Sequence, residues 1–264
     1  MTTANDIILG KLREIERDRS IRVILAVESG SRMWGFASPD SDYDVRFVYV
    51  REDTSVYRKF DHFGVPYNDT IQHMSEDRLY DFSGWDLPKF LRYLVGMNLT
   101  VVEWSTSPVV YIDEGVHEAV AAYVRGNTAF RLLVPAHRGM LLSEKACGLE
   151  NVKRAMYAAR SLLALRVLHV RGEMPRDFTW QTLIARAGLT DDERSFFERL
   201  HGLKVNSAEK SSAVPPDVKV YLEEEREKYR KMELPSARGL VITAEEKSAL
   251  DAIWAKFTFD GCVL

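Results

Sequence analysis

The chain is poor in cysteine and has no long uncharged apolar run. Its 264 residues include two cysteines, Cys147 and Cys262, which are too few and too widely separated for a zinc framework or a disulfide scaffold. No stretch runs long enough without charge to span a bilayer, and the charged start of the chain lacks the apolar core of a signal peptide. We therefore expect a cytoplasmic protein with no membrane partner.

A large excess of either charge is also missing. The chain has 36 Lys and Arg against 39 Asp and Glu, for a formal net charge of -3 and a pI near 6.1. This balance argues against a protein that coats nucleic acid in general, so any basic surface must be local. The length suffices for one large domain or two small ones, and we expect two.

Apolar patterning predicts a mixed α/β domain over residues 1–135. Ile8, Leu12 and Ile15 have helical spacing, and residues 21–27 are branched and apolar, as in a buried strand. A second strand is expected over 43–50 and a short one over 77–82, whereas the pattern over 56–71 is too weak to assign. A helix should begin at Asp86, which would cap it, with Pro88 in its first turn.

Residues 136–264 have the pattern of a helical domain. Apolar positions between Asn151 and Arg171 keep helical spacing. Thr190 with Glu193, and Thr243 with Glu246, have capping-box spacing. The polar run from Lys204 to Pro216 resembles a linker or loop. The predicted fold is therefore α/β (α+β), with a small mixed sheet followed by an all-helical domain. We expect the helical domain to complete a substrate-binding cleft with the first domain.

Gly30 and Ser31 follow the first predicted strand directly. Gly30 gives the backbone room to turn, because it has no Cβ. If Ser31 to Gly35 begin a short helix, the free N–H groups and the Ser31 hydroxyl can bind an anion. Arg32 comes next and can either fork onto a phosphate oxygen or form a surface salt bridge. This turn predicts a phosphate site that fits a triphosphate.

Asp42 and Asp44 begin the next predicted strand. Residues two apart on a strand share a face, so two hard oxygen ligands would lie side by side, as Mg²⁺ requires. Taken alone, such a pair is more often a solvated, turn-capping loop. The phosphate turn at the end of the preceding strand favours the metal site instead. Arg46 lies on the same face, and we expect it to pair with a carboxylate.

The residues from Glu28 to Phe47 resemble the signature of a bacterial and phage group of predicted nucleotidyltransferases in the DNA polymerase β-like superfamily, some of them called RNA-ligase-associated. The resemblance continues at Asp81–Leu87 and Asn98–Pro108, with a weaker match at Lys153–Arg160. Met33 and Pro88 depart from the pattern. The resemblance implies a polymerase β-like fold and a third metal-binding carboxylate, which is Asp81 here; a turn or cap role for Asp81 is the alternative.

The resemblance also implies the chemistry. Two Mg²⁺ ions, or Mn²⁺ in their place, would be held by Asp42, Asp44 and Asp81, and the nucleoside monophosphate of an NTP, expected to be ATP, would pass to a hydroxyl acceptor. The favoured acceptor is RNA or a tRNA end. The alternatives are an adenylyltransferase acting on a protein or small-molecule hydroxyl, and an inactive domain that only binds nucleotide or RNA.

Lys153, Tyr157 and Arg160 share a helix face in the helical half. They belong to a stretch without acidic residues whose basic members are Lys153, Arg154, Arg160, Arg166, His169 and Arg171. Such a patch can meet phosphates across a cleft, and Tyr157 can stack on a base. Alternatively, the patch is a solvated face paired with Glu223–Glu225, and Tyr157 belongs to the core. The predicted nucleotide-binding set is Gly30, Ser31, Arg32, Lys153, Tyr157 and Arg160.

Overall fold

The computed structural model describes residues 3–58, 69–143, 149, 151–206, 213–233 and 243–259. They divide into two compact units, and each is described by itself below. Unit 1 comprises Met1–Gly30, Asp42–Asn127 and Val241–Leu264, and unit 2 comprises Ser31–Ser41 and Thr128–Leu240. The chain thus passes from unit 1 to unit 2 after Gly30 and returns after Ser41.

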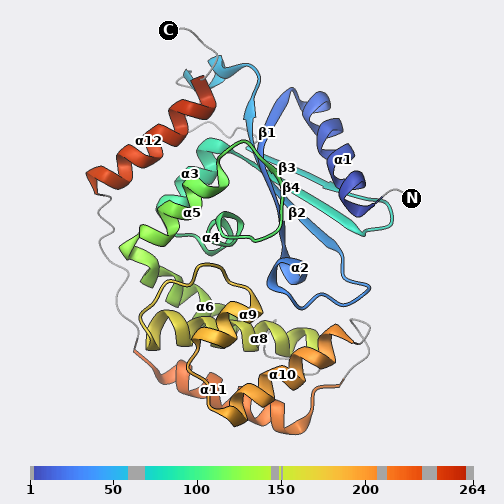
Figure 1. The fold of residues 1–264 in the computed structure, drawn as a ribbon, viewed down its shortest axis with the longest axis vertical. Helices are drawn as coiled ribbons and strands as arrows, with labels where there is room; N and C mark the ends of the chain where they lie inside the picture. Colours follow the sequence, from blue (N-terminus) through green and yellow to red (C-terminus); the bar gives the residue numbers. More distant parts are fainter. Residues whose placement is uncertain are drawn as a thin grey trace. The chain divides into compact units, whose positions relative to one another are not determined.

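Unit 1 is built on a five-stranded mixed sheet with the order β3-β4-β2-β1-β5 (Figure 1). The strands are β1 (Ile21–Ser29), β2 (Tyr43–Arg51), β3 (Thr70–Met74), β4 (Tyr80–Asp86) and β5 (Val110–Asp113). Strands β2 and β4 are parallel, and the other pairs are antiparallel. The predicted mixed sheet is confirmed. Of the region 56–71, β3 begins at Thr70, and residues 59–68 lie outside the described part of the chain.

Helices cover both faces of this sheet. They are α1 (Ala4–Arg19), α3 (Leu87–Val95), α4 (Leu99–Ser105), α5 (His117–Gly126) and α12 (Ala244–Phe259), with a 3-10 turn, η1, at Thr54–Arg58. Figure 1 shows α1 on one face and α3, α4 and α5 on the other. Pro88 lies in the first turn of α3, as predicted. None of the described helices is both long and apolar enough to cross a membrane.

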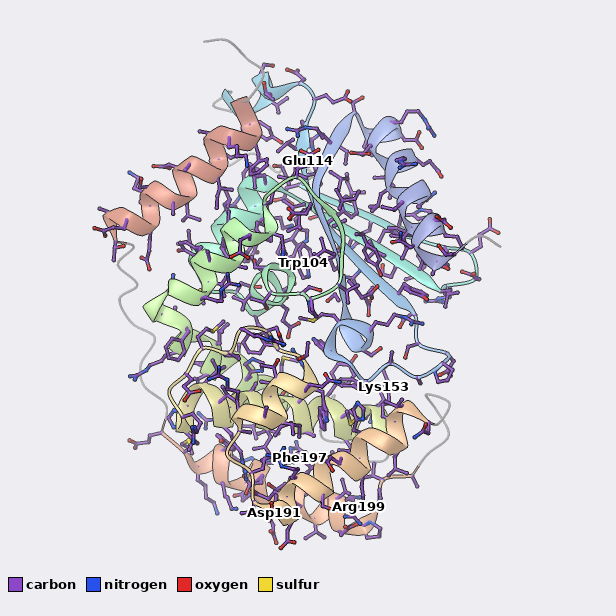
Figure 2. The ribbon with its side chains drawn as sticks, in the orientation of Figure 1. Trp104, Glu114, Lys153, Asp191, Phe197 and Arg199 are labelled. Atoms are coloured by element: carbon purple, nitrogen blue, oxygen red, sulfur yellow. The ribbon has the colours of Figure 1, made fainter. Side chains whose placement is uncertain are left out.

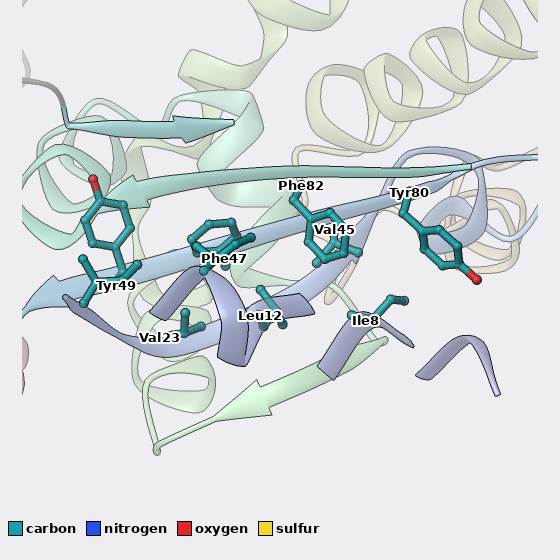
Figure 3. Packing of buried hydrophobic residues seen from close by; sticks show 11 residues of the cluster. Ile8, Leu12, Val23, Val45, Phe47, Tyr49, Tyr80 and Phe82 are labelled. Carbon is teal, nitrogen blue, oxygen red and sulfur yellow. The ribbon is translucent and has the colours of Figure 1, made fainter. Parts of the chain in front are cut away.

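The core between α1 and the sheet explains which way β2 faces. Ile8 and Leu12 are fully buried against Phe47 and its neighbours (Figure 3). Because side chains alternate along a strand, burial of Val45 and Phe47 on the α1 face turns the even-numbered side chains of β2 to the opposite face. The site carboxylate of Asp44 is therefore directed away from α1.

Unit 2 is helical, as predicted. Its helices are η3 (Thr128–Leu132), α6 (Leu133–Leu142), α8 (Val152–Leu165), the π-helical turn η4 (Arg166–Val170), α9 (Trp180–Arg186), α10 (Asp191–Val205) and α11 (Pro216–Lys231). Both predicted capping boxes form: Thr190 with Glu193 at α10 in this unit, and Thr243 with Glu246 at α12 in unit 1. On α10, Phe197 is fully buried, whereas Asp191 and Arg199 lie at the surface (Figure 2).

The compact units differ from the predicted division at residue 135 in three segments. Residues 128–135 already belong to unit 2, and two further segments lie far from the predicted boundary. Helix α12 belongs to unit 1, where it contacts α3 and α5. The segment 31–41 belongs to unit 2, because Trp34 and Phe36 pack on the aromatic side chains of that unit. Contacts between residues far apart in sequence place both segments, and local periodicity does not report such contacts.

The loop predicted from Lys204 to Pro216 is shorter than expected. Lys204 lies in the last turn of α10 and is buried, and α11 already begins at Pro216. Residues 207–212 lie outside the described part of the chain. The prediction was wrong for Lys204, because its ammonium group is taken up by a tertiary hydrogen bond described below.

Candidate functional site

The turn after β1 has the geometry that the sequence predicts. Gly30 has φ +62°, in the left-handed region that favours glycine, and a five-residue helix, α2 (Gly30–Trp34), follows. A Cβ on Gly30 would overlap the carboxylate of Asp44. Gly30 is therefore required both by its backbone conformation and by the close approach of an acidic side chain.

Asp44 and Asp81 are register partners on the adjacent parallel strands β2 and β4. The Arg46 guanidinium lies between them: its Nη2 is 2.7 Å from Asp44 Oδ1 and 2.8 Å from Asp81 Oδ2. Its Nη1 also donates to the backbone carbonyl of Asp81 at 3.0 Å. The sheet thus brings together two of the three predicted carboxylates, and the prediction that Arg46 pairs with a carboxylate is confirmed.

Glu28 holds the start of β2 and was not predicted from the sequence. Its side chain is buried, and its Oε1 accepts from the backbone N–H of Asp44 at 2.7 Å. The Tyr111 hydroxyl donates to the other carboxylate oxygen, and the Ser107 hydroxyl donates to the Glu28 carbonyl at 2.8 Å. A glutamate at the end of an apolar strand was the signal that could have found it. Glu28 positions Asp44 through its backbone.

The carboxylates suit a hard divalent cation. Asp44 and Asp81 offer adjacent oxygens on a partly exposed edge, with side-chain exposures of 23% and 29%, as Mg²⁺ prefers. Asp42 immediately precedes β2 and is half-buried. Among the described residues, no three acidic, imidazole or thiol groups form a ready metal cluster. Arg46 supplies the positive charge between two of the donors, a charge that a bound cation would supply in its place.

Asp86 occupies the N-cap position of α3, but its side chain makes no capping hydrogen bond. Instead, the fully buried carboxylate accepts from the Tyr57 hydroxyl at 3.3 Å and lies 3.7 Å from Arg51 Nε. Burial, reinforced by the Asp86 charge, raises the pKa of Tyr57 above its usual value. Asp86 thus lies at the predicted cap position, but the predicted capping hydrogen bond was wrong, because Tyr57 of η1 and Arg51 of β2 contact the carboxylate instead.

In unit 2, the helix that follows the glycine turn packs on α8. The Trp34 ring meets the Tyr157 ring edge to face at 5.2 Å, and the Arg160 guanidinium lies 4.0 Å from the centre of the Trp34 ring. The Arg32 guanidinium donates to the Ser41 carbonyl at 2.6 Å. Arg32 therefore joins the two ends of the segment 31–41, and its predicted contact with a phosphate stays a prediction.

Helix α10 also contacts the segment 31–41, through two hydrogen bonds. Lys204 Nζ donates to the Ser38 hydroxyl at 2.8 Å, within a buried environment. His201 Nε2 lies 2.8 Å from the Gly35 carbonyl oxygen, and its ring stacks on Trp180 at 5.7 Å. These α10 residues were not predicted from the sequence, because their partners lie 166 positions away.

The basic patch predicted on α8 is largely dispersed. Arg160 is fully buried, and its Nε donates to the Phe178 carbonyl at 3.3 Å. Arg166 pairs with Glu193 at 2.5 Å and with Glu225 at 3.6 Å. For Arg166 this matches the alternative prediction, in which the basic residues pair with the Glu223–Glu225 region. Of the predicted patch, Lys153 and Arg154 in the first turn of α8 are at least partly exposed, as are His169 and Arg171 beyond its end.

A cavity of about 780 Å³ lies between α6 and α8, within unit 2. Its lining includes two predicted nucleotide-binding residues, Lys153 and Tyr157, and the fully buried Ser161, whose hydroxyl has no hydrogen-bond partner among the described residues. The remaining lining residues are Ala136, Gly139, Met140, Ser143, Asn151 and Arg154. The cavity has the size of a small-molecule site and combines an apolar wall with basic groups.

Comparisons with known proteins identify the family of the chain. Residues 4–239 match a family described as the RNA repair pathway DNA polymerase beta family, or RlaP. The chain belongs to this family. An uncharacterized Bacillus subtilis (strain 168) protein, YcgL, is 32% identical over 209 residues, which cover 73% of this chain and 75% of YcgL.

A solved structure, that of a nucleotidyltransferase-like protein from Exiguobacterium sibiricum, aligns with 97% of this chain and 89% of its own, at 14% identity and a TM-score of 0.32. So distant a similarity says nothing about function, which follows instead from the family. As a member of the RlaP family, the protein is a polymerase β-like nucleotidyltransferase.

Proposed function

We propose that the protein transfers a nucleoside monophosphate from an NTP, with ATP as the expected donor, to a hydroxyl at an RNA or tRNA end and releases pyrophosphate. The observation that carries the proposal is the register pairing of Asp44 with Asp81 beside the Gly30 turn. The family's description as an RNA repair family supports RNA as the acceptor.

Asp42, Asp44 and Asp81 would hold two Mg²⁺ ions, or Mn²⁺ in their place. When bound, these ions would acidify the attacking hydroxyl and neutralise the triphosphate charge. The Asp81 carboxylate, which faces the same edge of the sheet as Asp44, would receive the proton of the acceptor hydroxyl. The Gly30–Ser31 turn would bind the triphosphate through backbone N–H groups and the Ser31 hydroxyl.

The cavity in unit 2 would take the nucleoside. Its apolar wall suits the faces of a base, and the half-buried Tyr157 ring, held edge to face by Trp34, is a stacking surface. Lys153 lies on the same helix face one turn before Tyr157 and would contact a phosphate. The Ser161 hydroxyl would bond to a polar edge of the base or to a ribose hydroxyl. Arg160 would act indirectly, through Trp34.

The decisive experiment replaces the carboxylates one at a time. Purified Asp42→Asn, Asp44→Asn and Asp81→Asn variants are incubated with labelled ATP, Mg²⁺ and separate pools of RNA, protein and small-molecule acceptors. We expect the wild type to label RNA and each variant to lose at least about a thousandfold in rate, with unchanged circular dichroism. The control is Asp251→Asn, which removes an exposed acid from α12.

The pools separate the alternatives. Label in the protein or small-molecule pool would replace the RNA acceptor with a protein or small-molecule hydroxyl while keeping the chemistry. Binding of ATP without label in any pool would indicate an inactive nucleotide-binding domain. Full activity of the Asp44→Asn or Asp81→Asn variant would refute the metal assignment.

A further inference from the structure

A second cavity, of about 620 Å³, lies in unit 1 at the end of the sheet remote from the carboxylates. Four arginines line it: Arg13 and Arg17 from α1, Arg22 from β1 and Arg51 from the end of β2. Asp44 and Arg51 are seven residues apart on β2, which corresponds to roughly 23 Å along the strand. The cavity is thus separate from the candidate catalytic edge but held by the same strand.

The charge of this cavity is not cancelled by its own acidic residues. Glu16 and Glu52 also line it, so four arginines face two glutamates. Glu16 is engaged by the backbone, because its Oε1 accepts from the Val23 N–H at 2.7 Å. Arg22 and Arg51 are paired with carboxylates outside the lining, so the positive charge that meets the solution is that of Arg13 and Arg17, which can bind an anionic ligand.

Two of the arginines can meet a ligand from solution. Arg13 and Arg17 are exposed and lie four residues apart on α1, so they share one helix face. Arg17 has a loose contact with its neighbour Asp18 at 3.6 Å, with both side chains more than half exposed. Exposed pairs of this kind contribute little, so they compete poorly with a phosphate.

The other two arginines are fixed in the wall of the cavity. Arg22 pairs with Glu114, which follows β5 and is labelled in Figure 2, and its Nη2 donates to the Phe257 carbonyl at 3.2 Å. Arg51 lies 3.7 Å from the buried Asp86. These carboxylates fix the two guanidinium groups in the wall and offset their charge, so the exposed pair, Arg13 and Arg17, supplies the positive charge at the rim.

A residue with a buried hydroxyl also lines this cavity. Thr258, on α12, is 3% exposed and lines the cavity, and its Oγ1 has no hydrogen-bond partner among the described residues. A buried polar group without a partner is costly, and a ligand oxygen would satisfy it. The hydroxyl and the guanidinium groups together match the oxygens of a phosphate.

We propose that this cavity binds a backbone phosphate of the acceptor RNA strand, several nucleotides away from the end that reacts. The inference rests on the proposed RNA acceptor, and the remoteness of the cavity from Asp44 explains why the ligand is a distal phosphate and not the NTP. The cavity would make a long acceptor bind better than a short one, because only the long strand reaches both places.

The test compares acceptor lengths. Binding of labelled single-stranded RNA of 20 and of 4 nucleotides is measured by fluorescence anisotropy at several salt concentrations, for the wild type and an Arg13→Ala/Arg17→Ala variant. For the 20-mer we expect the variant to lose affinity several-fold and its log–log salt slope to fall by about 0.7, which is the contribution of one phosphate contact on a single strand. Affinity for the 4-mer and transfer to it should not change.

Two further variants sharpen the result. Arg19→Ala removes the same charge from the same exposed helix at a position that does not line the cavity, so it should leave the salt slope unchanged. Thr258→Val keeps the shape and removes the hydroxyl, and it should weaken the 20-mer without affecting the 4-mer. Equal losses in Arg19→Ala and in the double variant would overturn the proposal, because they would indicate a diffuse charge effect.

Two further outcomes distinguish a phosphate of the RNA strand from free phosphate or ATP, and distinguish the cavity assignment from the proposed transfer reaction. If millimolar inorganic phosphate or ATP displaces the 20-mer to the same extent from wild type and double variant, the cavity does not bind the strand and the proposal fails. If the double variant loses 20-mer binding while no RNA is labelled by ATP, the cavity assignment holds and the proposed transfer reaction fails. Unchanged 20-mer binding in a double variant that still transfers label to RNA overturns the cavity assignment and leaves the transfer reaction in place.

Discussion

The Asp44 carboxylate occupies the space that a side chain on Gly30 would need. The two residues come from neighbouring strand ends, since β1 and β2 pair up to Ser29 and Asp44. A turn that leaves β1 with a positive φ and without a Cβ is therefore the condition for Asp44 to lie at the sheet edge. One glycine thereby serves both the predicted phosphate turn and the placement of a carboxylate.

Replacing Gly30 tests this dependence. The Gly30→Ala variant should lose about 1–3 kcal/mol of unfolding free energy, because the new Cβ is strained at positive φ and displaces Asp44. Transfer activity should fall with it. Urea unfolding gives the stability change. The control is Gly10→Ala in α1, where a Cβ meets nothing within 4 Å and should stabilise the helix by about 0.5–1 kcal/mol. Equal stability of the two variants would contradict the prediction.

Arg46 stands between two carboxylates that would also bind metal, so its removal should have opposite effects with and without Mg²⁺. In metal-free buffer, Arg46→Met should lose about 1–3 kcal/mol, because two partly buried carboxylates lose their cationic partner. Added Mg²⁺ should then raise the melting temperature of the variant more than that of the wild type. Differential scanning fluorimetry with and without Mg²⁺ measures both.

A matched control for Arg46 is Arg125→Met. Arg125 pairs with Glu118 on the exposed surface of α5, so its loss should change stability by less than about 0.5 kcal/mol and leave the Mg²⁺ response alone. If Mg²⁺ raises the melting temperature of Arg46→Met no more than that of Arg125→Met, the cation does not bind at the position of the Arg46 guanidinium between Asp44 and Asp81.

The buried imidazole of His137 should make the unfolding free energy of the protein sensitive to acid. Burial, assisted by the neighbouring Arg160, lowers its pKa to about 3. Because an unfolded histidine titrates near pH 6.5, the unfolded chain binds the proton first, and stability falls as the pH drops from about 6.5 toward 3. At pH 5 the loss should be about 2 kcal/mol relative to pH 7. The His137→Phe variant, which can keep the ring stack on Phe178, should lack this loss.

The pH window matters for this measurement. The Arg166 hydrogen bond lowers the pKa of Glu193 to about 2, so that carboxylate contributes stability above its unfolded value, and the contribution is lost as the pH falls below about 4.5. Denaturation between pH 5 and pH 7 therefore reports on His137 without Glu193. The same slope in the wild type and in His137→Phe would refute the assignment.

A substitution at Ser161 should have opposite effects on the stability of the protein and on its nucleotide binding. Its buried hydroxyl has no partner within the described part of the chain, so Ser161→Ala should raise the unfolding free energy by about 1 kcal/mol. If the hydroxyl binds the nucleoside, the same variant should raise the KM for ATP about three- to tenfold. The control is Ser105→Ala, which removes a buried hydroxyl that donates to the Val101 carbonyl at 2.8 Å; it should lose stability with an unchanged KM.

The local features of this protein were readable from the order of its residues. The apolar periodicity of Ile8, Leu12 and Ile15 and the run over 21–27 predicted α1 and β1, because each pattern matches the period of one element. The turn at Gly30 and the short helix after it followed from the same reasoning. Both capping boxes formed as expected, since their partners lie three residues apart.

Other features depended on partners that a linear pattern does not reveal. Asp86 was expected to cap α3, but buried partners from η1 and β2 claim its carboxylate. Arg160 was expected on an exposed face, but Trp34 and Phe178 enclose it. Lys204 was placed in a loop, but Ser38 holds it in the interior. In each case a distant side chain determines the environment.

The sequence by itself determined the elements, the class of fold and the residue types at the candidate site, because these follow from periodicity, turn chemistry and short-range motifs. Tertiary structure alone decided that Asp44 and Asp81 are register partners joined by Arg46, and that Glu28 holds Asp44 from behind. It also decided which basic residues face a cavity and which are buried. Strand register and side-chain burial arise from packing across the whole domain, and no local window contains that information.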